Sequence, residues 1–341
     1  SVNLFLGDGK NYSPAFGLPG THYQETTPDG EKRLCHLDMG ENPPEGVIVN
    51  YFIESEANFK PEKPLELIVL DANGVEIERF STKKTDEKLD RSESEESETS
   101  DDKASLTAKV GFNRFVWNMH YPGPEVKIDK SLEKVGYKPL GRGEDGPGGG
   151  PIAPPGSYQV CLKLGENEIR HSFEIVKDPR LNTSPEDFSA QFELWIKIRN
   201  RVSDVNSAIN HIRRIKLQIT ELLARENFNN SAEEKSFGEI QKGAEALREK
   251  FNKLENELTQ NQYETPSDRL RHPTMLKQRM EALVSVVAVA DAAPPKQAYS
   301  VFENLSVLID QRLAELSELE EQEVVRFNQQ IDQARIRKLQ G

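Results

Sequence analysis

The chain has 341 residues, 35% of them hydrophobic and 30% charged, which is typical of a soluble protein with room for two domains. Its net charge of −13 and the lack of any stripe of Lys and Arg argue against a nucleic-acid partner. The longest apolar run, 282–293, is too short to span a bilayer and contains Asp291, so we expect no transmembrane segment.

The start of the chain and its cysteines bear on its origin. It begins at Ser1 without a charged and apolar leader, and we interpret it as a fragment of a longer protein. Two cysteines, Cys35 and Cys161, are too few for a disulfide framework or a four-ligand zinc site. They leave open one bridge or two free thiols. Cys161 shares the polar face of its expected strand with Gln159 and Lys163, so it need not be a core residue.

Residues 1–177 are expected to form an antiparallel β-domain. Apolar-rich and alternating patterns predict strands, which lie at 47–53, 65–70, 75–80 and 110–119 and in a closing hairpin over 158–175. The dipeptide Asn73-Gly74 between two apolar-rich runs is a strong signal for a hairpin turn. About six short strands with Trp117 among them predict an immunoglobulin-like sandwich.

Two segments interrupt this domain. Residues 83–105 have almost no apolar side chains, and the part between Ser92 and Asp102 carries six carboxylates and no base, so we expect a disordered acidic insertion. Calcium binding is a minor alternative for it, because the ligand spacing and the turn glycine of a calcium loop are missing. Residues 141–156 are rich in Gly and Pro, and no helix follows them, so we expect a surface connection rather than a phosphate loop.

Four residues of this half are candidates for interaction. Trp117, His120 and Tyr121 gather at the end of a predicted strand, where they favour either a sugar-stacking platform or the end cap of the sandwich. The tripeptide Asp178-Pro179-Arg180 stops the closing hairpin. We interpret 178–183 as a junction in which Arg180 forms a salt bridge.

Residues 184–341 are expected to form an up-and-down helical bundle. Ser184, Pro185 and Asp187 predict a capped helix start. Apolar steps of three and four residues then mark a long amphipathic helix to Leu222, with one skipped turn at Arg199. Breaks near 227–230, 263–266 and 294–295 divide the remainder into three more helices, and short connections favour the bundle.

The last helix carries three further interaction candidates. Its apolar rhythm continues through Val324, Phe327 and Ile331, far enough to outrun the neighbouring helices. An overhang would expose these side chains, and our hypothesis is that 324–336 docks on a partner or on a second copy of the chain. The alternative is that the segment belongs to the core of the bundle.

Six stretches in fixed order carry a family resemblance: LFLGDGKNY, GENPPEGVIVNYFI, LELIVLDANGVEIERF, GFNRFVWNMHYPGP, GPIAPPGSYQVCLKL and KDPRLNTSPEDFSAQFELWIKIRNRVSDVNSAINHIR. Together they resemble the region that follows the β-propeller in bacterial sortilin-like BNR/Asp-box proteins, which are commonly labelled glycosyl hydrolases. The resemblance covers nearly the whole chain and implies an immunoglobulin-like sandwich followed by a helical tail. The sequence contains no Ser-x-Asp-x-Gly-x-x-Trp repeat, so the resemblance also implies that the propeller lies outside this chain.

No residue of the sequence is assigned a catalytic role. The six histidines are scattered, and none forms a pair with the helical spacing of metal ligands. Cys35, His36 and Asp38 make only a weak metal candidate, and the sequence has no Gly-x-Ser-x-Gly elbow. We therefore expect no cofactor, apart from the calcium alternative, and an enzyme label would rest on the relatives alone.

These observations favour a non-catalytic accessory or interaction module of a larger exported protein, located outside the cell, on its surface or in the periplasm. Its expected partner is the β-propeller domain or chain of the same protein, with a homo-oligomer as a further option. One alternative is a component of a glycan-active hydrolase whose catalytic propeller lies elsewhere. The other is a structural subunit that assembles through its helices.

Overall fold

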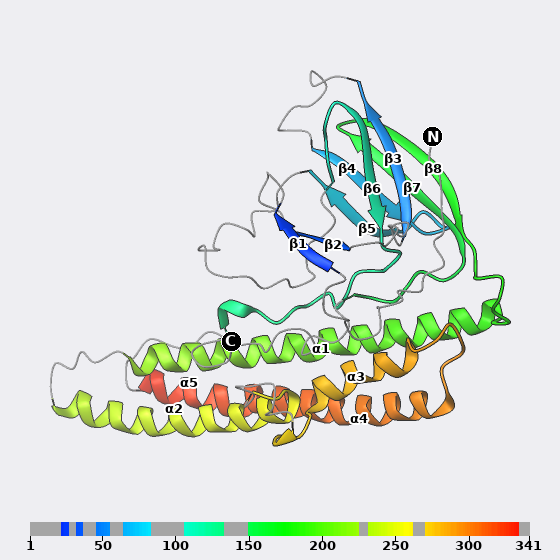
Figure 1. The fold of residues 1–341 in the computed structure, drawn as a ribbon. Coiled ribbons are helices and arrows are strands. Elements are labelled where there is room, and N and C mark those ends of the chain that lie inside the picture. Colours follow the sequence, from blue (N-terminus) through cyan, green and yellow to red (C-terminus); the bar gives the residue numbers. More distant parts are fainter. Residues whose placement is uncertain are drawn as a thin grey trace. The chain divides into compact units, whose positions relative to one another are not determined.

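The computed structural model of the chain describes residues 22–26, 32–36, 46–54, 64–82, 106–132, 149–224, 231–261 and 270–333. They form antiparallel sheets and α-helices, so the expected α+β class is confirmed (Figure 1). They fall into two compact units. The β unit draws on Ser1–Arg91, Asp102–Met119 and Pro155–Arg180, and the helical unit draws on His120–Pro154 and Leu181–Gly341.

The division between the units differs from the one expected from the sequence. Pattern alone places 120–154 in the β-domain, whereas the structure places this segment in the helical unit. The chain returns to the β unit at Pro155 and leaves it again after Arg180. Each unit is therefore discontinuous in sequence.

The described strands of the β unit all pair antiparallel: β1 (His22–Thr26), β2 (Lys32–His36), β3 (Val47–Ile53), β4 (Leu65–Leu70), β5 (Glu76–Ser81), β6 (Gly111–Trp117), β7 (Gly156–Leu164) and β8 (Asn167–Ile175). They form the sheets β1-β2, β3-β6 and β5-β4-β7-β8. The strands predicted from alternation, β3 to β8, are confirmed. The hairpin of β1 and β2 is not foreseen by the sequence analysis.

The predicted turn at Asn73-Gly74 is confirmed. The backbone N–H of Asp71 donates to the carbonyl of Val75 at 2.9 Å, and the N–H of Gly74 donates to the carbonyl of Asp71 at 3.0 Å. The Asp71 carboxylate accepts the N–H groups of Asn73 and Val75 at 2.9 and 2.8 Å. Gly74 has a φ of +79°, which an L side chain rarely adopts.

Aromatic contacts join the β3-β6 sheet to the β5-β4-β7-β8 sheet. The ring centroids of Phe80 and Phe115 lie 4.6 Å apart, and Trp117 lies 6.2 Å from Tyr158 and 6.3 Å from Phe173. Trp117 is only 1% exposed, so it is a core residue rather than a surface for sugar stacking. Gly46 is the residue before β3. A Cβ on Gly46 would lie 2.1 Å from the Trp117 carbonyl oxygen, so only glycine fits there.

Cys161 is a core residue, a point that its place on the polar face of the expected strand leaves open. It is 1% exposed and packs with Ile68 and Leu70 on the face that also carries Gln159 and Lys163. Cys161 is a free thiol, and burial raises its pKa. It is therefore a small apolar core residue, because a buried neutral thiol behaves as a hydrophobe.

The helical unit contains α1 (Pro185–Leu223), α2 (Ser231–Leu258), α3 (Leu276–Val287), α4 (Lys296–Glu318) and α5 (Val325–Gln333), with a π-helical segment, η5 (Leu319–Val324), between the last two. The predicted capping box of α1 is confirmed. The hydroxyl of Ser184 accepts the N–H of Asp187 at 3.2 Å, and the Asp187 carboxylate accepts the N–H of Ser184 at 3.3 Å.

The helices share one apolar core. α1 packs against α2, α3 and α4, and α2 also packs against α5 (Figure 1). The core includes side chains that are at most 1% exposed, among them Ile198, Ile209, Ile212, Phe251, Leu254, Met280 and Ile309. The apolar stripes recognised in the sequence thus face one another, and their burial is the main source of stability available to this unit.

The final helix is part of this core. Val324, Phe327 and Ile331 are 7%, 3% and 0% exposed and belong to the same apolar cluster. A Cβ on Gly243 of α2 would lie 3.3 Å from the Phe327 ring, which shows how closely α2 and α5 approach. The sequence analysis expects an exposed overhang here, and the structure contradicts it. These three side chains are not available as a docking stripe.

The burial of Phe327 gives a direct stability prediction. Phe327→Ala should lower the free energy of unfolding by about 3–5 kcal/mol, because it removes a buried ring from a packed core. Val325→Ala is the matched control, since Val325 lies two residues away on the same helix and is 49% exposed. The control should stay within about 0.5 kcal/mol of the parent in a urea titration. Equal losses for both variants would contradict the placement of α5.

Candidate functional site

The segment 120–132 lies along α1 and ends in the 3-10 helix η3 (Lys130–Leu132), and we call it the strap. Its first residues pair with 149–152: His120 bridges Ile152, and the N–H of Tyr121 donates to the Pro151 carbonyl at 2.8 Å. The N–H of Gly150 in turn donates to the Tyr121 carbonyl at 2.9 Å. A Cβ on Gly150 would lie 2.1 Å from the Pro122 carbonyl oxygen, so this pairing requires glycine.

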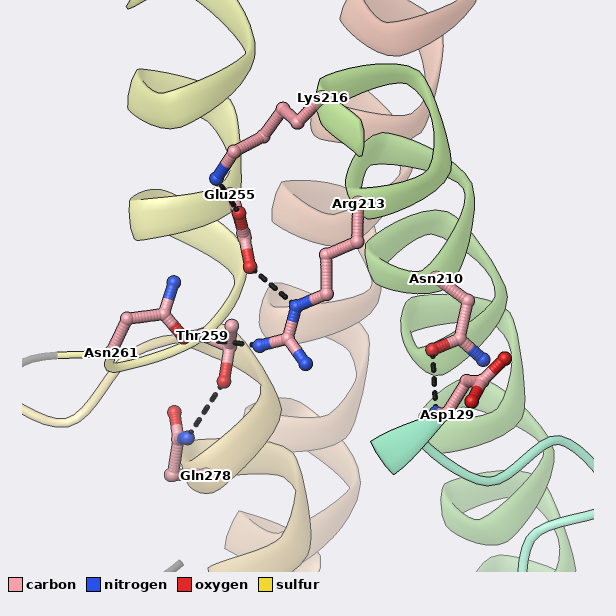
Figure 2. Close-up of polar contacts among 8 residues, drawn as sticks. All are labelled: Asp129, Asn210, Arg213, Lys216, Glu255, Thr259, Asn261 and Gln278. Carbon is pink, nitrogen blue, oxygen red and sulfur yellow. Dashed lines mark hydrogen bonds and ion pairs between the residues drawn. The ribbon is translucent and has the colours of Figure 1, made fainter. Parts of the chain in front are cut away.

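Two buried asparagines of α1 bind the backbone of the strap. Asn210 accepts the N–H of Asp129 at 2.8 Å (Figure 2). It also donates to the carbonyl of Lys127 at 2.8 Å. One turn earlier, the Asn206 amide donates to the carbonyl of Val126 at 2.8 Å. Both asparagines are about 95% buried, at 4% and 5% exposed. They bond backbone groups of a part of the strap that belongs to no strand.

Aromatic rings fix the start of the strap on α1. Tyr121 contacts Phe192 with a centroid distance of 4.8 Å and an angle of 64°, and His120 contacts Trp195 at 6.3 Å and 78°. Both are edge-to-face arrangements, which aromatic pairs prefer. Two of the residues proposed from the sequence, His120 and Tyr121, thus lie together in the helical unit.

Arg199 follows these rings on α1. Its Nη1 donates to the Pro122 carbonyl at 3.3 Å, and its Nε and Nη2 donate to the side-chain oxygen of Asn200 at 3.1 and 2.9 Å. Burial lowers the pKa of Arg199, and the nearby Glu125 partly offsets this effect. Arg199 is therefore a partly desolvated cation that follows the aromatic residues on α1.

A second polar cluster lies between α1 and α2. The carboxylate of Glu255 accepts hydrogen bonds from the Nε of Arg213 and the Nζ of Lys216, each at 2.7 Å (Figure 2). Only 3% of the Glu255 side chain is exposed. Burial alone would raise its pKa, but the ion pairs with Lys216 and Arg213 outweigh burial and hold the pKa below its ordinary value.

Further polar groups surround the end of α2. The Gln278 amide donates to the Thr259 hydroxyl at 3.0 Å, and Arg213 also reaches the side-chain oxygen of Asn261 at 3.3 Å (Figure 2). The Gln260 amide donates to the Pro273 carbonyl at 2.9 Å. These contacts satisfy the irregular backbone and side chains where the chain leaves α2, so we interpret them as structural.

The π-helical segment η5 presents acids to two different helices. Glu320 lies 2.6 Å from the Nε2 of His211 on α1, and Glu323 lies 2.9 Å from the Nζ of Lys250 on α2. The hydrogen bond from Lys250 lowers the pKa of Glu323. Glu320 and Glu323 of one segment thus face different helices, and Glu323 is engaged in an ion pair with Lys250.

The structure does not assemble the sequence-predicted candidates into one site. Trp117 lies in the core of the β unit, His120 and Tyr121 lie in the helical unit, and Arg180 is in the β unit. Arg180 binds Asp178 within its own tripeptide, with an Nη2 to Oδ2 distance of 2.6 Å. The expected salt bridge is therefore present, and it is local.

Several of these residues were missed by sequence reasoning. The backbone-binding asparagines and Glu255 carry no sequence signal that separates them from exposed polar residues on the same helices. Arg199 does carry one, because it interrupts the apolar stripe of α1 at the skipped turn. A charged residue in an apolar stripe has to find a polar neighbour, and here that neighbour is the strap.

No group of three or more His, Cys, Asp or Glu side chains that could hold a metal ion occurs among the described residues. The acidic insertion 83–105, the basis of the calcium alternative, lies outside those residues. Within the described part of the chain, no helix is long and apolar enough to cross a membrane. Comparisons with protein-family models, with curated proteins and with solved structures found no match.

The bonds of Asn210 predict a specific loss on mutation. Asn210→Ala should destabilise the protein by about 1–3 kcal/mol, because it removes the buried side chain that bonds the Asp129 N–H and the Lys127 carbonyl. Hydrogen exchange at the Asp129 amide should accelerate along with the loss of stability. Asn304→Ala, at an exposed asparagine of α4, is the control and should change neither. Unchanged exchange at Asp129 in the Asn210 variant would contradict the described strap.

The buried carboxylate gives a second prediction. Glu255→Gln should lower the free energy of unfolding at pH 7 by about 3–5 kcal/mol, because Arg213 and Lys216 lose the charge that compensates them. Glu249→Gln makes the same chemical change at an exposed position of α2 and should be nearly neutral. Chemical denaturation of both variants beside the parent measures the difference.

The pH dependence of this difference follows from the lowered pKa of Glu255. A carboxyl group with a depressed folded-state pKa stabilises the protein fully above its unfolded value, here 4.5, and loses that contribution as the pH falls through the folded-state value. The gap between the parent and Glu255→Gln should therefore be constant near neutral pH and shrink below about pH 4.5. A gap that widens on acidification would contradict the ion pairs.

Proposed function

We propose that the chain is an accessory interaction module of a larger exported protein, and that its partner is the β-propeller domain or chain of that same protein. The observation that carries the proposal is an exposed pair of aromatic rings on the β unit. The choice of partner rests on the sequence resemblance to the region that follows the propeller in sortilin-like BNR/Asp-box proteins. We further propose that the β unit is an immunoglobulin-like sandwich and the helical unit an up-and-down bundle.

The exposed pair consists of Phe52 on β3 and Phe112 on β6. The two residues are directly opposite in the strand register, and their ring centroids lie 5.0 Å apart at 66°. Phe52 is 56% exposed and Phe112 is 85% exposed, and Val110, just before β6, is 51% exposed. Isolated exposed apolar residues are common, but adjoining ones form a patch of the kind that marks an interaction surface.

The rest of the same outer face differs from this patch. At its other end Ile48 is 6% exposed, and in the middle Arg114 donates to the side-chain oxygen of Asn50 at 3.2 Å. The outer face thus has a covered end, a polar middle and an exposed aromatic end. A partner that binds the exposed rings would also meet the Arg114 and Asn50 pair at its rim, which matches the apolar centre and polar rim of protein interfaces.

A substitution in this pair tests the proposal. Phe112→Ser should weaken binding to the separately expressed propeller at least about tenfold, because buried aromatic anchors dominate binding energy. The stability of the chain itself should change little, since the ring is exposed. Val75→Ser is the matched control in the same unit, as Val75 is 61% exposed and lies outside the patch. Isothermal titration calorimetry measures binding, and a melting curve checks the fold.

Two results would overturn the proposal. One is that neither the full reading frame of this protein nor a neighbouring gene encodes a propeller with Ser-x-Asp-x-Gly-x-x-Trp repeats. The other is equal binding of the propeller by the parent and by Phe112→Ser. Hydrolysis of a glycan only by the reconstituted pair would favour the alternative of a glycan-active hydrolase component.

Assembly through the helices is the second candidate function. Val301, Val307 and Leu308 of α4 are 43%, 55% and 38% exposed, so this helix carries apolar surface in addition to its core stripe. A free-standing reading frame and a sedimentation coefficient that rises with protein concentration would favour this structural role over the accessory module.

A further inference from the structure

Strand β8 (Asn167–Ile175) forms one edge of the four-stranded sheet (Figure 1). The strand order β5-β4-β7-β8 gives β8 one neighbour, β7, and among the described residues no strand pairs with its other side. An edge strand presents a row of backbone N–H and C=O groups that its own sheet does not use. β8 therefore offers hydrogen-bond donors and acceptors to a further strand.

The exposure of its side chains indicates that β8 is the more accessible edge of the sheet. Every residue from Asn167 to Ser172 is exposed, and Ile169 is 60% exposed although it is apolar. The other edge strand, β5, has six residues, of which only Glu76 and Arg79 are exposed. A further strand can therefore approach β8 over most of its length.

β8 also lacks several features that keep natural edge strands from pairing. Such strands are often short, or they carry a lysine, a proline or a bulge. β8 has nine residues, its sequence NEIRHSFEI contains neither Lys nor Pro, and its register with β7 is uninterrupted. The pairing of β5 with β4, by contrast, contains a register shift between Val69 and Leu70. The backbone of β8 is thus suited to accept another strand.

The charged side chains of β8 determine which strand can pair with it. Glu168, Arg170 and Glu174 share one face of the strand, because alternate residues point to the same side. Glu168 and Arg170 form an ion pair with each other. Opposite charges that face each other on neighbouring strands are stabilising, and like charges are destabilising. An incoming strand is therefore favoured when it places an acid opposite Arg170.

A second copy of β8 that runs antiparallel meets this condition. When Ser172 of one copy lies opposite Ser172 of the other, Arg170 lies opposite Glu174 at two symmetric positions. The stretch 169–175 of one copy then pairs with 169–175 of the other. The contact is self-complementary, as the interface of a two-fold dimer has to be.

Other antiparallel registers of two β8 strands fit less well. Centring the pair on His171 places Glu168 opposite Glu174, and centring it on Arg170 places two arginines opposite each other. Centring it on Ile169 avoids like charges but pairs a shorter stretch of β8. The register centred on Ser172 therefore combines the longest pairing with opposite charges.

We propose that the chain forms a homodimer in which the β8 strands of two copies pair antiparallel about a two-fold axis at Ser172. The backbone of β8 supplies the hydrogen bonds, and the pairs of Arg170 with Glu174 set the register. The interface uses residues other than Phe52 and Phe112, so it does not depend on the propeller-binding function proposed above.

Analytical ultracentrifugation of the full chain tests the association. It should show a monomer–dimer equilibrium that depends on concentration, because an interface of one strand pair is small. Arg170→Glu should weaken dimerisation at least about tenfold, since it places like charges opposite each other twice. Adding Glu174→Arg restores opposite charges across the axis and should recover most of the affinity. Lys253→Glu makes the same change of charge at an exposed position of α2 and should have no effect.

A cysteine cross-link tests the register directly. The Cβ atoms of residues opposite each other on paired strands lie about 4.5–5.5 Å apart, which a small movement brings within reach of a disulfide. Ser172→Cys should therefore give a disulfide-linked dimer under mild oxidation. Asn167→Cys is the control, because Asn167 is also exposed on β8 but would lie opposite Lys177 of the second copy. The parent chain controls for its own thiols, Cys35 and Cys161.

Three results would overturn the proposal. One is a chain that stays monomeric at every concentration, and another is a cross-link formed by Asn167→Cys and not by Ser172→Cys. The third is a dimer that folded Arg170→Glu forms as well as the parent does. If that dimer is lost in Leu308→Ser, the assembly belongs to the exposed apolar surface of α4 instead. Melting curves of all variants show which of them are folded.

Discussion

The helical unit depends on a simple requirement, which is that buried backbone groups need hydrogen-bond partners. The strap has no strand pairing beyond its first residues, yet it covers part of α1. Asn210 meets this requirement with both the donor and the acceptor of its side-chain amide, and Asn206 contributes its donor. Asn113 does the same in the β unit, where it bonds the backbone of Lys109 and Gly111. Buried asparagines thus let irregular segments pack as closely as strands do.

Buried charges in the helical unit have a similar requirement, because each needs an opposite charge as its partner. Glu255 remains ionised in a buried position because Arg213 and Lys216 form ion pairs with it. Its negative charge in turn compensates the buried charge of Arg213. Arg199 follows a different arrangement, since it is partly buried and its hydrogen bonds end on the neutral oxygens of Pro122 and Asn200.

The sequence predicts local features well where one interaction decides the outcome. Ser184 and Asp187 cap α1 as expected, and Asn73-Gly74 makes its turn, because each depends on contacts within a few residues. The hairpin of β1 and β2 was missed, since HYQET and KRLCH lack an apolar alternation. The burial of Phe327 was misjudged and that of Cys161 was left open, because burial depends on which remote segment covers a side chain. The strap was missed for the same reason, as its partners lie some eighty residues away on α1.

The strap also constrains the order in which this protein can be completed during synthesis. Residues 120–132 leave the ribosome before β7, β8 and α1 have been translated, so Val126, Lys127 and Asp129 must keep water as their partner in the meantime. The helical unit can close only after its last helices emerge, since α5 supplies part of the core. A recombination event that transfers 181–341 as a contiguous cassette would leave the strap behind and expose two amide side chains that evolved to be covered. Inheritance of the two units as a pair is the simplest way to avoid that loss.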